Sequence, residues 1–266
     1  MHCEYTFRQT GVDMNKSKET FRDAALRLEF EYRIFVSFGI VIAVALIALG
    51  PFNYLRSPVE GLLSLLGISS SWTENLKYFA PAIFMVAASA LRIWAGSTLS
   101  SHRMMSFRVQ TDTLLTEPPY TLCRNPIYLA DFTAFCGFAL ILPAVAVSLP
   151  VLLLLHYTRL IRYEEAELRW KFGAEYSTYE KHSPPFFPNL KSIRATILSG
   201  RGMRFNGDGF RHNALYLLFI PGFIVAAFTH NFYHALAIGL PAVFDWAIIH
   251  TVIGTSDRRP TTNSGD

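Results

Sequence analysis

The stretch Pro118–Asp131, PPYTLCRNPIYLAD, carries an arginine, two tyrosines and a rigid Asn–Pro step just before a long apolar run begins at Ile127. Asn is a favoured helix N-cap and Pro a favoured first helical residue, so Asn125 and Pro126 predict the start of a helix. Arginine and tyrosine at the start of an apolar helix are typical of a membrane edge. The stretch therefore predicts a polar corner where a helix enters an apolar environment.

The composition identifies that environment as a lipid bilayer. Hydrophobic residues make up 51% of the 266 residues, charged residues only 17%, and the mean hydropathy is +0.26. Several apolar windows are long enough to cross a hydrocarbon core of about 30 Å as helices. We therefore expect an all-α, polytopic membrane bundle of about six transmembrane helices, at residues 34–52, 78–97, 127–142, 144–161, 213–229 and 233–253.

The basic residues indicate an orientation, because Lys and Arg concentrate in cytoplasmic loops. With six spans, they gather in the N-terminal segment, in the 98–126 loop, in the 162–211 segment and in the tail, whereas the opposite side holds only Arg56 and Lys77. Both termini are then expected in the cytoplasm, at a bacterial inner membrane or the endoplasmic reticulum. The net charge of +4 follows from this bias, so nucleic-acid binding is not expected.

The chain divides into parts of different composition. The polar N-terminus predicts no cleavable signal peptide. We expect an amphipathic cytoplasmic segment at 1–33, the first two transmembrane helices at 34–97, a core of helical hairpin plus cytoplasmic helix at 98–190, a linker and C-terminal transmembrane hairpin at 191–254, and a disordered tail at 255–266.

A second polar segment follows the fourth apolar window. It begins with Glu164 and Glu165 and is expected to form a separate charged helix to Tyr179. The apolar windows on either side of Pro143 form a short hairpin that goes out and returns to the same boundary. Arg124 and Tyr128 at its start are therefore expected near Arg162, Glu164 and Glu165 at its end.

These two segments also resemble a family. PPYTLCRNPIY is similar to the Gly-Pro-Tyr, then Arg-His/Asn-Pro-x-Tyr signature of the integral-membrane methyltransferases, which include isoprenylcysteine carboxyl methyltransferase and the phospholipid N-methyltransferases. The segment 164–188 resembles the second motif of that family in order and spacing. Pro118 stands where the family usually has Gly, Asn125 where it often has His, and Ala130 where Gly often follows the Tyr. A role of that His in relatives cannot be carried over.

The resemblance implies methyl transfer from S-adenosyl-L-methionine. Arg124 is the first choice to bind the cofactor carboxylate bidentately, while glutamates can accept ribose hydroxyls and tyrosine rings can hold a sulfonium. We expect Arg124, Tyr128 and Glu165 to be catalytic. The expected cofactor site comprises Tyr120, Arg124, Asn125, Pro126, Tyr128, Glu164 and Glu165.

Each of these residues also has a purely structural interpretation. Arg124 could be an anchor at the end of a span, and Tyr120 and Tyr128 could belong to the interfacial aromatic belt. Glu164 and Glu165 could be a solvated helix start, where acidic residues favour the helix dipole. The presence of both motifs in order favours the functional interpretation.

Ionisable residues within apolar windows are costly and point to function. Arg92 and Asp245 are such residues, and we expect Asp245 to pair with Arg92 or to line the substrate cavity. Together with His156 and Arg162 they form the expected substrate site. No metal site is expected, because three cysteines lie at unrelated spacings and the histidine pair at 230 and 234 has no third ligand nearby.

The expected acceptor is a lipid-like or prenylated molecule taken from the bilayer. Motif spacing favours O-methylation of a carboxylate, as in the isoprenylcysteine branch, over N-methylation of a phospholipid amine. One alternative is an NADPH-dependent sterol or steroid reductase, although those enzymes usually have Pro-Asn-Tyr where this chain has Pro126, Ile127 and Tyr128. Another is a non-catalytic transporter or scaffold that uses Arg92 and Asp245 as a polar pathway.

Overall fold

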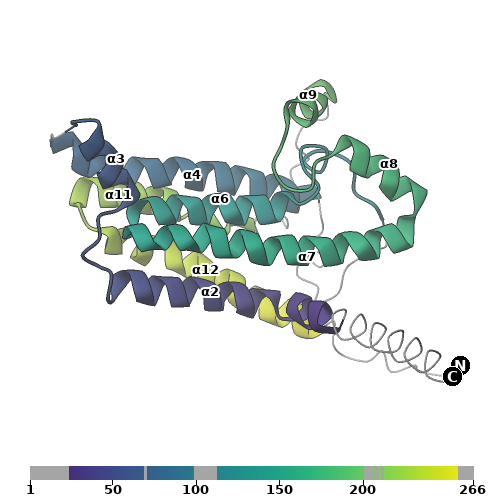
Figure 1. Cartoon of the computed structure of the whole chain (residues 1–266), viewed down its shortest axis with the longest axis horizontal. Helices are drawn as coiled ribbons and strands as arrows, with labels where there is room; N and C mark the ends of the chain where they lie inside the picture. The colour runs from purple at the N-terminus through teal and green to yellow at the C-terminus, as the bar shows by residue number, and fades with distance from the viewer. Residues whose placement is uncertain are drawn as a thin grey trace, which may run out of the picture.

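The computed structural model describes residues 24–68, 71–98, 113–200 and 213–256, together with residues 207 and 210, and every regular element among them is helical. The expected all-α class is therefore confirmed. Figure 1 shows the long helices lying side by side as a bundle. The bundle helices are α2 (Arg33–Leu49), α4 (Ser71–Thr98), α6 (Pro126–Ile141), α7 (Ser148–Phe172), α11 (Phe219–Thr229) and α12 (Phe232–Ser256).

Each of the six apolar windows coincides with one of these helices, but their lengths differ. Among the described residues, two helical segments are long and apolar enough to cross a membrane alone, and the pair Ala24–Glu31 and Arg33–Leu49, bent by 71°, makes a third if it counts as one span. Three apolar segments are shorter than the roughly 20 residues of a typical span. The two long segments are Asn75–Thr98 and Ala144–Phe172, and the short ones are Pro126–Ile141, Ala214–Thr229 and Phe232–Ile248. The count of six spans therefore stays a prediction.

The helix after the fourth window differs from the prediction. α7 continues without a break to Phe172, so Glu164 and Glu165 belong to it and not to a separate helix. Helix-forming residues fill this stretch, and the break comes only at Gly173, whose φ of +52° is a conformation that favours glycine. α8 (Ala174–His182) follows and ends just before the two prolines at 184 and 185, as expected.

Two short helices were not predicted. α3 (Pro58–Leu65) and α9 (Leu190–Leu198) each begin with a capping box, formed by Ser57 with Glu60 and by Asn189 with Ser192. Figure 1 shows α9 outside the bundle, at the end where α8 lies. The 1–33 segment and the tail lie largely outside the described residues, which begin at residue 24 and end at residue 256.

Small residues bring the bundle helices close together. α4 packs against α6 and α11, while α7 packs against α6 and α2. On α6, a Cβ atom at Gly137 would lie 2.8 Å from the Cβ of Phe84 on α4, and on α11 a Cβ at Gly222 would lie 2.9 Å from the Ala235 carbonyl oxygen of α12. Such close helix contacts are typical of membrane bundles. The contact at Gly137 fixes α4 against α6, and the contact at Gly222 fixes α11 against α12.

Candidate functional site

The two sequence motifs meet at one end of the bundle. Arg124 precedes α6, Glu165 lies on α7, and the two form a bidentate ion pair: Arg124 Nε donates to Glu165 Oε1 at 2.8 Å and Nη2 donates to Oε2 at 3.0 Å. Both side chains are buried, with exposed fractions of 9% and 8%. The convergence expected from the hairpin is therefore present for these residues. We call this pair the clamp.

The remaining donors of Arg124 bind the end of α8 and the chain just after it. Nη1 donates to the carbonyl oxygens of Ser183 at 2.7 Å and Glu180 at 3.3 Å. The backbone N–H of Arg124 donates to the Pro184 carbonyl, and the Asn125 side chain donates to that of Pro185, both at 2.8 Å. Asn125 is the N-cap residue of α6, as expected, but its side chain does not cap the helix. The guanidinium is thus occupied by the protein, which leaves it little capacity for a cofactor carboxylate.

A second layer of charges surrounds the clamp. Arg169 on α7 donates to Glu165 at 3.2 Å and to both carboxylate oxygens of Glu180, at 2.5 and 3.0 Å. The hydrogen bond from Arg169 lowers the pKa of Glu180, which is otherwise raised by partial burial. Glu165 therefore accepts hydrogen bonds from two arginines, and the clamp ties α6, α7 and α8 together.

Three tyrosines line the polar end of the cavity beside the clamp. Tyr128 donates to Glu164 at 3.0 Å. Tyr120 and Tyr176 are buried, and their hydroxyl groups have no hydrogen-bond partner among the described residues. Burial raises the pKa of Tyr120 well above its usual range, so its hydroxyl is protonated at neutral pH. Tyr120 and Tyr176 therefore each hold a buried phenol hydroxyl without a partner in the wall of the cavity.

The cavity itself has a volume of about 470 Å³ and extends from the clamp into the apolar part of the bundle. Its polar end is lined by Glu164, Glu165 and the three tyrosines, and its far end by apolar side chains of α2, α6 and α7. One stripe of α6 follows it from end to end at helical spacing. This stripe consists of Tyr128, Asp131, Phe135, Phe138 and, just past the helix, Leu142.

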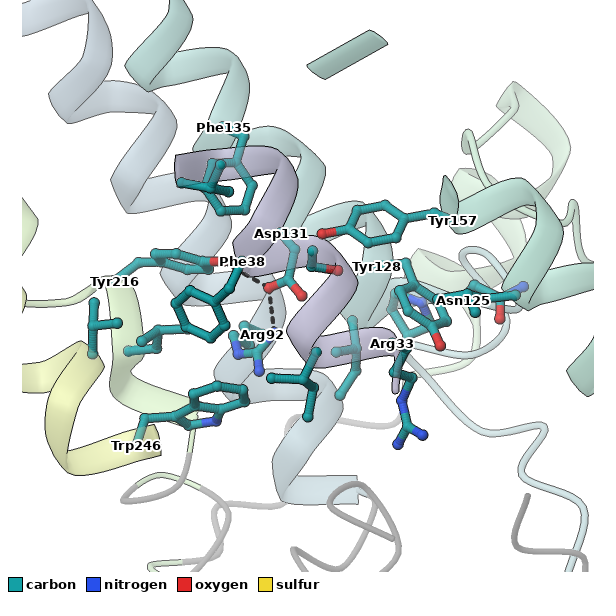
Figure 2. A pocket seen from close by; sticks show the side chains of 18 of the residues that line it. Arg33, Phe38, Arg92, Asn125, Tyr128, Asp131, Phe135, Tyr157, Tyr216 and Trp246 are labelled. Atoms are coloured by element: carbon teal, nitrogen blue, oxygen red, sulfur yellow. Dashed lines mark hydrogen bonds and ion pairs between the residues drawn. The ribbon is translucent and has the colours of Figure 1, made fainter. Parts of the chain in front are cut away.

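A second group of polar residues lies deeper in the cavity. Arg92 on α4 forms an ion pair with Asp131 on α6, and the Tyr216 hydroxyl donates to Asp131 Oδ1 at 2.9 Å (Figure 2). Asp131 was not selected from the sequence, although it is the acidic residue within the third apolar window. The reasoning that selected Arg92 and Asp245, a charge inside an apolar window, applies equally to it.

The structure brings only one of the four expected substrate residues to the cavity. Arg92 lines it, but its partner is Asp131 and not Asp245, which is exposed on α12 because the neighbouring Trp246 faces inward. Arg162 is exposed on the outer face of α7. His156 is buried away from the cavity lining, where Nδ1 contacts Glu29 at 2.9 Å.

Comparisons with known proteins agree with the motif resemblance over the middle of the chain. Residues 76–175 match the family model described as phospholipid methyltransferase. The chain is 28% identical over 126 residues to the cobalt-zinc-cadmium resistance protein CzcN of Cupriavidus metallidurans, which is 47% of this chain and 55% of the relative. It is 25% identical over 142 residues to the nickel-cobalt-cadmium resistance protein NccN of Alcaligenes xylosoxydans xylosoxydans, which is 50% of this chain and 62% of the relative.

The aligned region thus spans somewhat more than half the length of each of these curated relatives. No solved structure matches the chain. Within the part of the chain that the structure describes, no group of three His, Cys, Asp or Glu side chains could hold a metal ion. Over residues 76–175, which match the phospholipid methyltransferase family model, the resemblance of the motifs to the integral-membrane methyltransferases is confirmed.

Proposed function

We propose that this protein transfers a methyl group from S-adenosyl-L-methionine to a lipid-like acceptor within the membrane. The observation that carries the proposal is the cavity, which has a polar end with two unpartnered phenol hydroxyls and an apolar body that continues along α6. Buried polar groups without partners are costly, so they are expected to bind a ligand. A polar cofactor at one end and an apolar acceptor in the body match this division.

The residues at the polar end fit the bound cofactor. The carboxylate of Glu164 and the hydroxyls of Tyr120 and Tyr176 would hold its hydroxyl, amino and carboxylate groups. The rings of Tyr120 and Tyr128 would lie against its cationic sulfonium. Methyl transfer is an in-line displacement in which the cofactor supplies the methyl group, so the protein contributes mainly by orienting the two reactants.

The clamp has a different role in this proposal. Because Arg124 binds both Glu165 and the chain after α8, the two clamp residues act as positioning residues that hold Tyr128 and Glu164 at the cavity. Asn125 and Pro126 set the start of α6 and belong to the same support. The direct cofactor contacts expected of Arg124 and Glu165 from the sequence are replaced here by this supporting function.

The acceptor reaches the cavity from the bilayer, and the clamp end faces the cytoplasm together with both termini. The spacing of the motifs favours a carboxylate acceptor of the isoprenylcysteine kind, whereas the family whose model matches methylates phospholipids. A carboxylate needs no general base, while a protonated amine must lose a proton before it attacks the methyl group. The curated relatives are named as metal resistance proteins, so we place the proposed activity in that physiological setting. Among the described residues, no group of side chains could hold a metal ion.

The cofactor assignment is tested by titrating the detergent-purified protein with S-adenosylhomocysteine and, separately, with NADPH, while following the midpoint of thermal unfolding. We expect a rise with the first ligand only. Tyr120→Phe and Tyr176→Phe should each weaken its binding about three- to tenfold, since each removes one hydrogen bond. Tyr54→Phe, a change on an exposed tyrosine, is the matched control.

Other outcomes of that titration contradict the proposal. A response to NADPH alone would favour the reductase. A folded protein whose unfolding midpoint changes with neither ligand would favour a non-catalytic transporter or scaffold. Binding of S-adenosylhomocysteine that is equally strong in both tyrosine variants would show that the cofactor does not lie at this end of the cavity.

A further inference from the structure

The Arg92–Asp131 pair lies in the part of the cavity where charges are most expensive. Taking two charged side chains out of water is costly, and apolar residues of similar size often stabilise a protein as well or better. Packing between α4 and α6 is already provided by the close contact at Gly137. The pair is therefore better explained by a ligand than by stability.

The hydrogen bonds to Asp131 leave half of its carboxylate unused. Arg92 and Tyr216 both donate to Oδ1. Oδ2 accepts no hydrogen bond from the residues that the structure describes. Arg92 is only 3% exposed whereas the Asp131 side chain is 19% exposed, and both line the cavity. Asp131 is thus the member of the pair that a ligand can reach.

Arg92 also contributes a buried polar atom to this place. Its Nε–H has no hydrogen-bond partner among the described residues, and its guanidinium lies over the rings of Tyr216 and Trp246, at 5.8 and 5.7 Å. Figure 2 shows Phe38, Tyr157 and Tyr216 around the carboxylate and Trp246 on the side of Arg92. Aromatic faces attract cations, so a carboxylate among such rings is suited to a protonated amine.

The position of Asp131 along α6 relates it to the polar end. It follows Tyr128 by three residues, just under one helical turn, which is about 4.5 Å along the helix axis. Beyond it, the same stripe of α6 continues with Phe135 and Phe138 into the apolar end. A ligand whose chain filled that end would therefore place its head group beside Asp131, one turn deeper than Tyr128.

We propose that Asp131 Oδ2 binds the amine head group of a lipid-like ligand and that Arg92 and Tyr216 are positioning residues that fix this carboxylate. Asp131 then determines specificity, because it favours a head group that donates hydrogen bonds over a bare carboxylate, which would meet a like charge at Oδ2. That the ligand is the methyl acceptor rests on the proposed function. Binding of the amine at Asp131 does not depend on the proposed function.

The test compares three probes of equal chain length, dodecylamine, dodecanol and dodecanoate, added to the full chain in phosphatidylcholine nanodiscs at pH 7. Thermal unfolding is followed at increasing probe concentration. We expect dodecylamine to act at the lowest concentration, and Asp131→Asn to raise its half-maximal concentration about tenfold through loss of a charge-assisted hydrogen bond. Glu175→Gln, the same change on an exposed carboxylate of α8, should leave it unchanged.

Asp131→Asn leaves the Arg92 charge without its counter-ion, which destabilises the fold. A second variant is therefore needed as a folding control. In the double variant Arg92→Gln with Asp131→Asn both charges are removed together, and the tenfold loss should persist. S-adenosylhomocysteine should still bind to both variants. A protein that binds dodecylamine through Asp131 but does not respond to S-adenosylhomocysteine would contradict the methyltransferase proposal alone.

Three results overturn the inference itself. The first is an equal response of the wild type and the folded variants to dodecylamine. The second is a stronger response to dodecanoate that disappears with Arg92→Gln, which would make Arg92 an anion site. The third is the absence of any response to dodecylamine beyond that of dodecanol.

Discussion

The clamp and the Arg92–Asp131 pair are both ion pairs between an arginine and a carboxylate far apart in sequence, yet their hydrogen bonding differs. In the clamp both oxygens of Glu165 accept hydrogen bonds, and Arg124 also binds two carbonyl groups. In the deeper pair Asp131 receives both of its hydrogen bonds on one oxygen, and Arg92 Nε is unpartnered among the described residues.

This difference indicates different roles for the two pairs: the clamp supports the structure of the site, and the deeper pair can bind a ligand. A guanidinium with its donors occupied, such as that of Arg124, holds helices in place and has little left for a ligand. A pair with an unused donor and an unused acceptor keeps capacity for a ligand inside the cavity. In our proposal the motif residues form the frame of the site, and Asp131, which lies just beyond the motif, is one of its ligand contacts.

The largest expected effect comes from breaking the clamp. Arg124→Ala leaves Glu165 buried with only Arg169 as a partner, and removing one member of a buried ion pair costs about 3–5 kcal/mol. We expect a marked fall in the thermal unfolding midpoint in detergent together with loss of S-adenosylhomocysteine binding. Arg124→Lys should rescue little, because an ammonium cannot form the bidentate pair and reach the two carbonyls as well.

The control for this prediction is Arg162→Ala, which removes an exposed arginine from the same helix as Glu165 and should hardly change the midpoint. If Arg124→Ala keeps the wild-type midpoint but loses only cofactor binding, the supporting role assigned to the clamp is wrong. Arg124 would then be a direct ligand of the cofactor, as its motif suggests.

A smaller effect is expected when the helices that carry the deeper pair are pushed apart. A Cβ at Gly137 would lie 2.8 Å from the Cβ of Phe84, so Gly137→Val should destabilise the bundle by about 1–3 kcal/mol and separate Arg92 from Asp131. Gly39→Ala on α2 is the control, because nothing lies within 4 Å of its Cβ position. It should be neutral or stabilise by up to about 1 kcal/mol through helix propensity.

The measurement is again the unfolding midpoint, together with the response to dodecylamine. The clamp lies at the end of α6, so S-adenosylhomocysteine binding should survive in Gly137→Val while the amine response is lost. Loss of both ligands to the same degree would mean that the two pairs do not act separately.

Much of the frame was predictable from sequence, because it depends on local patterns. Apolar windows located the six bundle helices, Asn125 and Pro126 located the start of α6, and a short hairpin required Arg124 to approach Glu165. The length of α7 was not predictable in the same way. A polar helix and the end of an apolar one form a continuous helix unless a residue such as Gly173 interrupts them.

The sequence could not predict which buried charged residues pair with each other. Pairing Arg92 with Asp245 assumed only that opposite charges in apolar windows meet, but one residue on a helix changes direction by about 100°, and on α12 it is Trp246 that faces the cavity. A motif also does not show which donors are already occupied, since the carbonyls that bind Arg124 belong to Glu180 and Ser183, more than 50 residues later at the end of α8.

The smallest expected effect concerns the outer layer of the clamp and depends on pH. Arg169 lowers the pKa of Glu180 below the ordinary value of 4.5, so this contribution to stability is present above that pH and is lost as the pH falls through the lower folded-state value. Glu180→Gln should therefore lower the unfolding midpoint slightly at pH 7, and the difference from wild type should shrink as the pH falls below 4.5 and through the lowered pKa of Glu180. Glu175→Gln on the same exposed helix controls for loss of a charge. A difference that stays constant across this range would show that Glu180 supports the clamp by packing alone, and the ionic network would then end at Glu165.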